Sequence, residues 1–164
     1  MRFPKRNKNE RRSRMKNVYI ANDHAAVDLK NELCPYIESL GFHVINLGTD
    51  EKTSVNYPEY AEKAAKAVLA DEGSLGILIC GTGIGMSLAA NKVHGIRAAA
   101  VSEVYSAKLT RMHNDANMVC IGARVIGPET AKMIVEAFLT TPFEGGRHQK
   151  RVDMITEIEE RESK

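Results

Sequence analysis

Five short apolar runs alternate with segments of helical periodicity from residue 18 onward. The apolar runs cover residues 18–21, 44–47, 75–80, 96–101 and 118–121. Helices are expected over residues 25–40, 58–71, 84–93, 103–112, 128–139 and 147–160. Strands that alternate with helices are typical of βαβ units. The pattern therefore predicts an α/β, three-layer Rossmann-like fold, in which a five-stranded parallel sheet is flanked by helices.

The first helical segment has a clear apolar face and a clear end. Gly41 follows it and is a suitable C-terminal stop. Pro35 lies inside it and removes one backbone donor, so we expect a kink or an early break there. The apolar face consists of Leu29, Leu33, Ile37 and Leu40.

The charge of the chain divides into two unlike parts. Residues 1–16 hold eight Lys/Arg and one Glu, which leaves 15 Lys/Arg and 20 Asp/Glu in the remainder. A body with this acidic balance argues against nucleic acid as a partner. We expect residues 1–14 to be a disordered basic extension, and residues 15–164 to form a single domain. Translation starting at Met15 is an alternative.

The composition also bears on compartment and redox state. No stretch of about 18 uncharged apolar residues occurs, and the basic N-terminus has no apolar signal segment after it, so we expect a cytoplasmic protein with no membrane partner. Cys34, Cys80 and Cys120 are far apart and form no CxxC pair. They are interpreted as thiols rather than as a disulfide framework or a zinc site.

The strongest local motif is Cys80-Gly81-Thr82-Gly83-Ile84-Gly85, which follows the third apolar run. Its alternating glycines allow a tight turn whose N–H groups can approach an anion. Backbone donors beside a cysteine favour its thiolate, which can act as a base or a nucleophile. Two other interpretations stay open from this loop alone. One is a nucleotide site, although Met86 breaks the GxGxxG pattern; the other is a glycine turn beside an inert buried cysteine.

Polar residues elsewhere in the chain suit phosphate binding and proton transfer. Arg147 and Arg151 are four residues apart, so on a helix they can hold one phosphate together, with His148 as a third group. A solvated basic turn is the alternative. Asp23-His24 follows the first strand and His113-Asn114 follows a predicted helix; a histidine is the usual proton shuttle near neutral pH. Ligand sites of parallel sheets lie at the carboxyl ends of strands, which predicts a site around Asp23, Cys80 and Arg124.

Four segments together resemble the type B ribose-5-phosphate isomerase family, which also includes the subunits of galactose-6-phosphate isomerase. The segments are NDHAA at 22–26, CGTGIGMSLAANKVHGIRAA at 80–99, RMHNDANMVCIGARVIG at 111–127 and GGRHQKRVD at 145–153. The resemblance implies one sugar-phosphate isomerase domain that interconverts D-ribose 5-phosphate and D-ribulose 5-phosphate in the pentose phosphate pathway. It implies no metal and no organic cofactor.

The resemblance also implies a role for each candidate site residue. Cys80 would carry a proton between C2 and C1 through a cis-enediolate, assisted by Thr82. The amides of residues 81–85 would hold the enediolate oxygen. His113 would be the acid that opens the furanose ring, with Asp23 at the anomeric hydroxyl. Contacts with the sugar and its phosphate would come from His24, Asn114, Arg124, Arg147 and Arg151.

A branch of this family uses a Glu at the position of Met86, and because Met cannot accept a proton, Cys80 would be the base in this chain. The resemblance also implies a homodimer whose active sites are shared between subunits, so His113 and Asn114 of one subunit would reach Cys80 of another. The C-terminal helix would pack on the partner subunit through an apolar stripe. Dimer and tetramer stay open. The stripe consists of Val152, Ile155 and Ile158.

Three rival functions stay open from the sequence. The nearest is isomerisation of a six-carbon substrate, such as allose 6-phosphate or galactose 6-phosphate. The second is a non-catalytic sugar-phosphate or nucleotide sensor on the same scaffold, which would not require Cys80, Asp23 and His113 together. The third is a nucleic-acid role for the basic extension, which would show salt-dependent binding.

Overall fold

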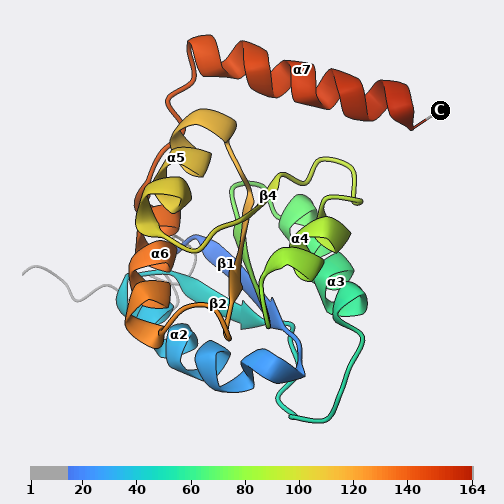
Figure 1. Cartoon of the computed structure of the whole chain (residues 1–164). Helices are drawn as coiled ribbons and strands as arrows, with labels where there is room; N and C mark the ends of the chain where they lie inside the picture. The colour runs from blue at the N-terminus through green and yellow to red at the C-terminus, as the bar shows by residue number, and fades with distance from the viewer. Residues whose placement is uncertain (1–14, 164) are drawn as a thin grey trace, which may run out of the picture.

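A computed structural model describes residues 15–163, and a parallel sheet forms its centre (Figure 1). The strand order is β2-β1-β3-β5-β4, and every neighbouring pair is parallel. This confirms the predicted α/β fold with a five-stranded parallel sheet. The predicted basic extension at residues 1–14 lies outside the described residues. The strands are β1 (Asn17–Asn22), β2 (His43–Asn46), β3 (Leu75–Cys80), β4 (Ala98–Ala100) and β5 (Met118–Gly122).

Helices cover both faces of this sheet. One face packs against α2 (Val27–Ser39), α5 (Val104–Asn114) and α6 (Pro128–Thr140), and the other packs against α3 (Tyr57–Ala70) and α4 (Ile84–Ala90). A short 3-10 turn, η1 (His24–Ala26), precedes α2. The last helix, α7 (Arg147–Glu162), lies across one end of the molecule, above α5 and β4 (Figure 1).

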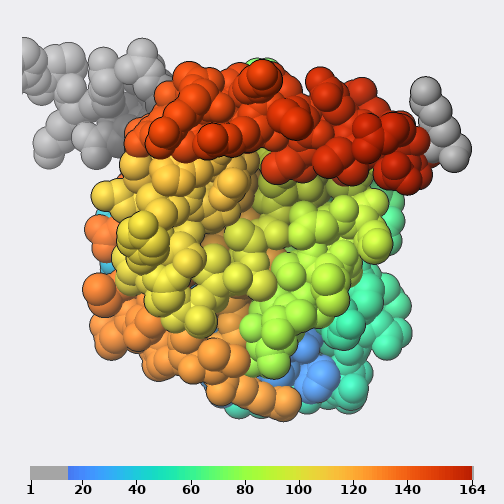
Figure 2. Space-filling view, turned by 45° about the horizontal axis from the view of Figure 1, so that its top comes forward, coloured from blue at the N-terminus to red at the C-terminus, as the bar shows by residue number. Residues whose placement is uncertain are grey.

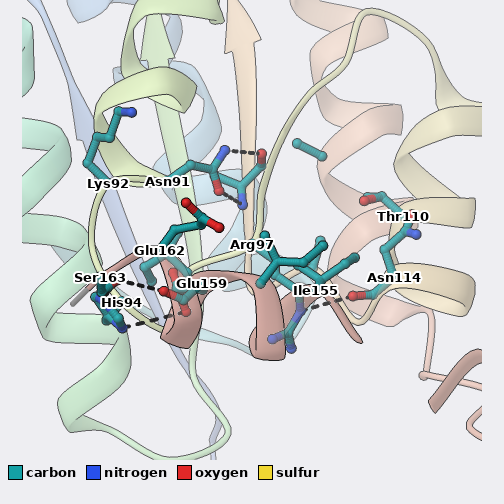
Figure 3. A pocket seen from close by; sticks show the side chains of 15 residues that line it. Asn91, Lys92, His94, Arg97, Thr110, Asn114, Ile155, Glu159, Glu162 and Ser163 are labelled. Carbon is teal, nitrogen blue, oxygen red and sulfur yellow. Dashed lines mark hydrogen bonds and ion pairs between the residues drawn. The ribbon is translucent and has the colours of Figure 1, made fainter. Parts of the chain in front are cut away.

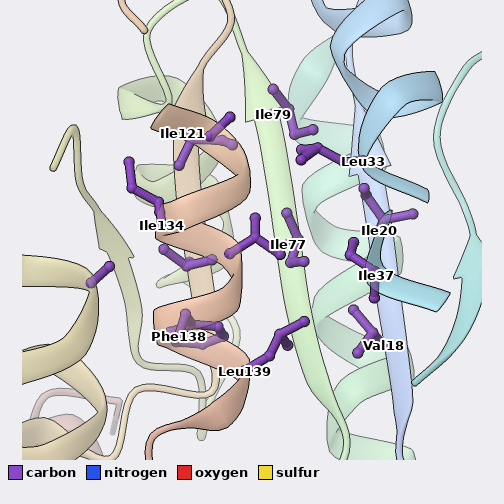
Figure 4. Packing of buried hydrophobic residues seen from close by; sticks show 14 of the residues in the cluster. Val18, Ile20, Leu33, Ile37, Ile77, Ile79, Ile121, Ile134, Phe138 and Leu139 are labelled. Atoms are coloured by element: carbon purple, nitrogen blue, oxygen red, sulfur yellow. The ribbon is translucent and has the colours of Figure 1, made fainter. Parts of the chain in front are cut away.

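Aliphatic side chains fill the space between the sheet and its helices (Figure 4). All six residues of β3 are buried, as expected for the middle strand of a covered parallel sheet. Each fully buried Leu, Ile, Val or Phe side chain stabilises the fold by about 1.5–3 kcal/mol. The strand ends are therefore held firmly, and the loops that leave them are positioned by this core.

A kink or an early break was expected at Pro35, and the early break was wrong, because Pro35 does not end its helix. Helix α2 continues from Val27 through Pro35 to Ser39. Pro35 and Asn31, whose carbonyl loses its usual N–H partner, both lie on the exposed face of the helix, where water can bond that carbonyl. The predicted stop at Gly41 is confirmed, because Gly41 follows the helix with φ +94°.

Helix α7 contacts its own chain at both ends. Its first part lies against α5, and its last part meets the segment after α4, where Glu159 accepts a hydrogen bond from the Gly95 N–H at 3.0 Å. Of the predicted apolar stripe, Val152 is buried, whereas Ile155 and Ile158 are about half exposed. Packing of α7 on a second subunit stays a prediction. None of the helices within residues 15–163 has the length and apolar character needed to cross a lipid bilayer.

Candidate active site

The carboxyl ends of β1, β3 and β5 bring together several of the predicted site residues, and we call this region the carboxyl edge. Asp23 lies beside Cys80, because the Asp23 N–H donates to the Ile79 carbonyl at 3.1 Å. On the other side, the Ala123 N–H donates to the Cys80 carbonyl at 2.8 Å. The predicted grouping of Asp23, Cys80 and the segment after β5 is therefore confirmed.

Cys80 ends β3 with its thiol turned into the glycine loop. The side chain is 5% exposed, and the Gly83 N–H donates to its Sγ at 3.1 Å. A backbone donor of this kind stabilises negative charge on sulfur. Cys120, two residues before Gly122 on the neighbouring strand, has no such donor within residues 15–163, and burial raises the pKa of the Cys120 thiol far above its ordinary value. The two thiols on this face of the sheet therefore differ in their surroundings.

The glycine loop is held in one shape by close packing. Gly83 has φ +79°, and a Cβ at this position would lie 2.9 Å from the backbone carbonyl carbon of Ile121. A Cβ on Gly85 would lie 2.8 Å from the ring of Tyr57. A larger residue at Gly83 would force the loop to move because it would meet backbone, whereas one at Gly85 would have to displace the Tyr57 ring.

Thr82 and Arg124 complete the loop. The Thr82 Oγ1 accepts a hydrogen bond from the Ile84 N–H at 3.2 Å, and the hydroxyl lies on an exposed residue. The Arg124 N–H donates to the Gly81 carbonyl at 3.0 Å, and a Cβ on Gly81 would lie 3.6 Å from the Arg124 side chain. Arg124 therefore places a cation at the loop, as predicted.

Asp23 and His24 are fixed by their neighbours. The Asp23 carboxylate caps η1 by accepting from the Ala25 N–H at 2.9 Å, and the residue is buried. The His24 Nδ1 accepts from the Val55 N–H at 3.3 Å. The neutral His24 ring therefore carries its proton on Nε2.

Two residues near this edge were missed by the sequence reasoning. One is Tyr57, whose ring lies against Gly85 and is about two-fifths exposed. The other is Lys30, which is fully buried and donates to the Thr49 carbonyl at 2.9 Å and to Asp50. Lys30 lowers the pKa of the Asp50 carboxyl below its usual value. A signal existed for Lys30, since its position in the helical periodicity lies on the buried face.

The other predicted site residues lie at the opposite end of the sheet, which we call the amino edge. The His113 ring, at the end of α5, stacks on the ring of His148 with centroids 4.2 Å apart and an interplanar angle of 10°. His148 Nε2 lies 3.3 Å from a Glu144 carboxylate oxygen. Burial, with His113 and Arg147 as the next causes, lowers the pKa of His148. Arg151 follows Arg147 by one turn on α7, and both are exposed.

The turn after His113 is held by two arginines. Asp115 ends α5 with φ +45°, and its carboxylate contacts Arg111 at 2.8 Å and Arg97 at 3.3 Å. The Arg97 Nε also donates to the Asn114 carbonyl at 3.0 Å. Asn114 is thereby placed next to the start of β4, beside His113.

The two edges are too far apart to act on one small molecule within one chain. The turn that carries His113 leads to Asn117, whose carbonyl accepts from the Gly76 N–H at the start of β3. Cys80 is four residues further along β3, which corresponds to about 13 Å at about 3.3 Å per residue. Direct proton transfer needs groups within hydrogen-bond reach of the substrate. We call these two separate groups of candidate site residues half-sites.

A cavity of about 690 Å³ lies beneath α7 at the amino edge (Figure 3). Asn114 lines it from α5, and Arg97 and His94 line it from the segment before β4. Helix α7 contributes Ile155 and Glu159 (Figure 3). The cavity therefore adjoins the His113 half-site and is separate from the glycine loop.

Comparison with known proteins agrees with this geometry. Residues 18–155 match the family described as Ribose/Galactose Isomerase. The chain is 50% identical to ribose-5-phosphate isomerase B of Escherichia coli over 147 residues, which cover 90% of this chain and 99% of that protein. It is 44% identical to D-erythrulose-4-phosphate isomerase of Pectobacterium atrosepticum over 150 residues, covering 90% and 98%.

A solved structure is similar over almost the same span. Ribose-5-phosphate isomerase B of Clostridium thermocellum superposes with a TM-score of 0.86 at 46% identity, covering 88% of this chain and 98% of that one. The shared fold, the family match and the level of identity agree with one another. The chain belongs to the ribose/galactose isomerase family of sugar-phosphate isomerases.

Proposed function

We propose that this protein interconverts D-ribose 5-phosphate and D-ribulose 5-phosphate by ring opening followed by proton transfer through a cis-enediolate. The observation that carries the proposal is the Cys80 thiol, which receives the Gly83 N–H in a rigid glycine loop beside Asp23. In this mechanism Cys80 removes the proton from C2 of the open aldose and returns it to C1. The same step in reverse forms the aldose.

The residues around Cys80 suit the charge that this reaction develops. The amides of residues 81–85 would stabilise the enediolate oxygen, and the exposed Thr82 hydroxyl would pass the proton between the two substrate oxygens. Met86 is fully buried in the core and has no proton-accepting group. This supports Cys80 as the base of this loop.

Ring opening and phosphate binding would come from a second copy of the chain. His113 would protonate the ring oxygen while Asp23 accepts the proton of the anomeric hydroxyl. Arg147 and Arg151, near His113, would bind the phosphate with His24 and Arg124. Because these groups divide between the carboxyl and amino edges of one chain, we propose a homo-oligomer whose sites are shared between subunits.

The edge of the sheet at β4 supplies a surface for this association. Strand β4 is a short edge strand with half-exposed residues, flanked by α4 and α5 under α7 (Figure 2). Exposed apolar side chains lie on both flanking helices: Ile84, Leu88 and Tyr105 are 56%, 63% and 72% exposed. A two-fold contact through this surface would set one carboxyl edge against the other copy's amino edge. Further apolar area is offered by Ile155 and Ile158 on α7.

The substrate class is tested by comparing kcat/KM for sugar phosphates of four, five and six carbons with the purified chain. We expect the highest value for ribose 5-phosphate. The similarity to an enzyme named D-erythrulose-4-phosphate isomerase makes a four-carbon substrate the main alternative. Allose 6-phosphate and galactose 6-phosphate are the six-carbon alternatives. A preference for either class would overturn the five-carbon assignment while leaving the isomerase chemistry in place.

The chemistry is tested by Cys80→Ala, with Cys34→Ala as the matched control. Cys34 is a partly buried thiol on α2 that packs against the hydrophobic core and is not part of the glycine loop. Loss of the base should lower kcat by about 10²–10⁴-fold, whereas the control should keep its activity. If Cys80→Ala isomerises ribose 5-phosphate normally, or if the unmodified chain binds sugar phosphates without turnover, the proposed mechanism is wrong.

A further inference from the structure

His113, Glu144 and His148 each bring a possible metal-ligand atom to one place at the amino edge. Their ring nitrogens and carboxylate oxygen all lie within 4.8 Å of one another. We propose that this cluster is an inhibitory binding site for a divalent cation of the zinc class. The cation would be a reversible inhibitor and not a cofactor, because it would occupy a side chain that the reaction needs.

The cluster is already assembled in the folded chain. The Glu144 N–H donates to the Met112 carbonyl at 3.1 Å, which ties the segment before α7 to the end of α5. Gly145 and Gly146 then turn the chain with φ values of +64° and +55°. This turn places His148 against His113, and the His148 side chain is only 6% exposed there. Binding would therefore require little rearrangement of the backbone.

The ligand atoms suit zinc better than magnesium or calcium. Two imidazoles and one carboxylate are a common donor set for Zn²⁺, whereas Mg²⁺ and Ca²⁺ prefer oxygen ligands alone. The observed separation of 3.3 Å between His148 Nε2 and the Glu144 oxygen matches the about 3.4 Å between ligands at about 2.0–2.1 Å in a tetrahedral zinc site. The nearly parallel rings would have to open their stack by turning about their side-chain bonds before both point at one ion, and water would fill the fourth position.

Nearby charge indicates that such a site would bind reversibly. The Arg147 Nε lies 3.5 Å from His148 Nε2 and must move away from a cation at this nitrogen. Arg151 lies one turn further along the same helix. Repulsion from these two guanidinium groups would weaken binding relative to a structural zinc site. A bound phosphate on the arginines would reduce this repulsion.

The inhibitory part rests on the proposed function. A nitrogen of His113 that coordinates zinc cannot carry a proton to the sugar ring oxygen. Zinc on His148 would also displace the Arg147 guanidinium, whose Nε lies 3.5 Å from His148 Nε2, from the place where it would bind the phosphate. Ring opening would stop while the thiol half-site around Cys80 remained unchanged.

The test is direct titration of the full, reduced chain with ZnCl₂ in competition with a chromophoric zinc chelator. We expect one zinc ion per chain. His148→Ala and Glu144→Gln should each weaken binding by at least about tenfold, since even outer-shell changes cost about 10–100-fold. His94→Ala is the matched control, because His94 faces Glu159 at 3.8 Å as an exposed His–Glu pair without a second histidine. Its zinc affinity should equal that of the unmodified chain.

The proposed site would be wrong if zinc did not bind, if binding survived both substitutions, or if binding were lost in Cys80→Ala. Far-UV circular dichroism checks that each variant is folded, and Glu144→Gln keeps the shape of the side chain. The activity arm is separate: zinc should inhibit isomerisation and a chelator should restore it. If zinc binds at this cluster but activity is unchanged, the inhibitory role is wrong. If the chain has no isomerase activity at all, the titration still decides whether the site exists.

Discussion

The two edges of the sheet are built by different means. At the carboxyl edge, backbone groups and glycines form the site, and close packing against Ile121 and Tyr57 fixes its shape. At the amino edge, long side chains form the site, and ion pairs and ring stacking position them. The first arrangement suits a fixed thiol and oxyanion-binding amides. The second suits the ring-opening and phosphate-binding groups of the proposed shared site.

The largest expected effect comes from two variants that each inactivate one edge. Cys80→Ala and His113→Ala should each lower kcat by about 10²–10⁴-fold, because each removes a proton-transfer group. If sites are shared between two copies, mixing and reassembling the two variants should restore about a quarter of wild-type activity. About half of the randomly formed dimers contain one copy of each variant, and each such dimer has one intact site out of two. The measurement is kcat after refolding the mixture.

The control is a mixture of Cys80→Ala with Asp23→Ala, which lie at the same edge. No intact site can form in that mixture, so it should stay inactive. Recovery in the control, or none in the Cys80 and His113 mixture despite a confirmed mixed oligomer, would contradict the shared site.

The glycines at the two edges offer a second comparison. Gly83 and Gly145 both have positive φ, so Ala at either position should be destabilised by a similar amount of backbone strain. Only at Gly83 would the new Cβ meet backbone, whereas at Gly145 nothing lies within 4 Å. Gly83→Ala should therefore be less stable than Gly145→Ala by about 1–3 kcal/mol. Urea unfolding of both variants measures this difference, and equal stabilities would mean that the loop relaxes freely.

Much of the carboxyl edge could be predicted from the sequence. The parallel topology places strand ends together, and this is a local consequence of the βαβ pattern. Asp23, Cys80 and Arg124 therefore met as expected. The amino edge was less accessible to such reasoning, because the contact of His113 with His148 depends on where α7 returns to the sheet. No periodicity within either helix contains that information.

The other misses have physical causes as well. Pro35 was expected to break its helix, but its effect depends on whether water can reach the carbonyl of Asn31. Tyr57 was missed because its contact with Gly85 joins two segments that are 28 residues apart in the printed sequence. The burial of Lys30 could have been inferred from the helical periodicity, but its partners, Thr49 and Asp50, lie in an irregular segment. These contacts are tertiary, and single-sequence patterns do not specify them.

A smaller effect is expected from the turn at the amino edge. Asp115→Asn keeps the size and the tolerance of positive φ but removes the charge that pairs with Arg97 and Arg111. Arg111 is buried, and its Nε has no hydrogen-bond partner among residues 15–163. Losing the anion should lower the free energy of unfolding by about 1–2 kcal/mol. Asp153→Asn on the exposed side of α7 is the control, and an equal effect there would contradict a special role for the turn.

The smallest effect concerns pH. The pKa of His148 is lowered in the folded protein by burial and by the facing groups His113, Arg147 and Arg151, while Glu144 acts in the opposite direction. Below about pH 6.5, the ordinary pKa of histidine, the unfolded chain therefore binds more protons than the folded chain at this residue. The free energy of unfolding should fall as pH decreases from about 6.5 toward the folded pKa of His148.

His148→Phe isolates this contribution, because Phe can stack on His113 but cannot titrate. Urea unfolding at about pH 7.5 and about pH 5 should show a smaller loss of stability on acidification for His148→Phe than for the unmodified chain. Titrating groups that do not contact His148 contribute equally to both proteins and cancel in the comparison. If both proteins lose the same stability, protonating His148 costs no more in the folded chain than in the unfolded chain. The stacking of His148 on His113 would then have no electrostatic cost.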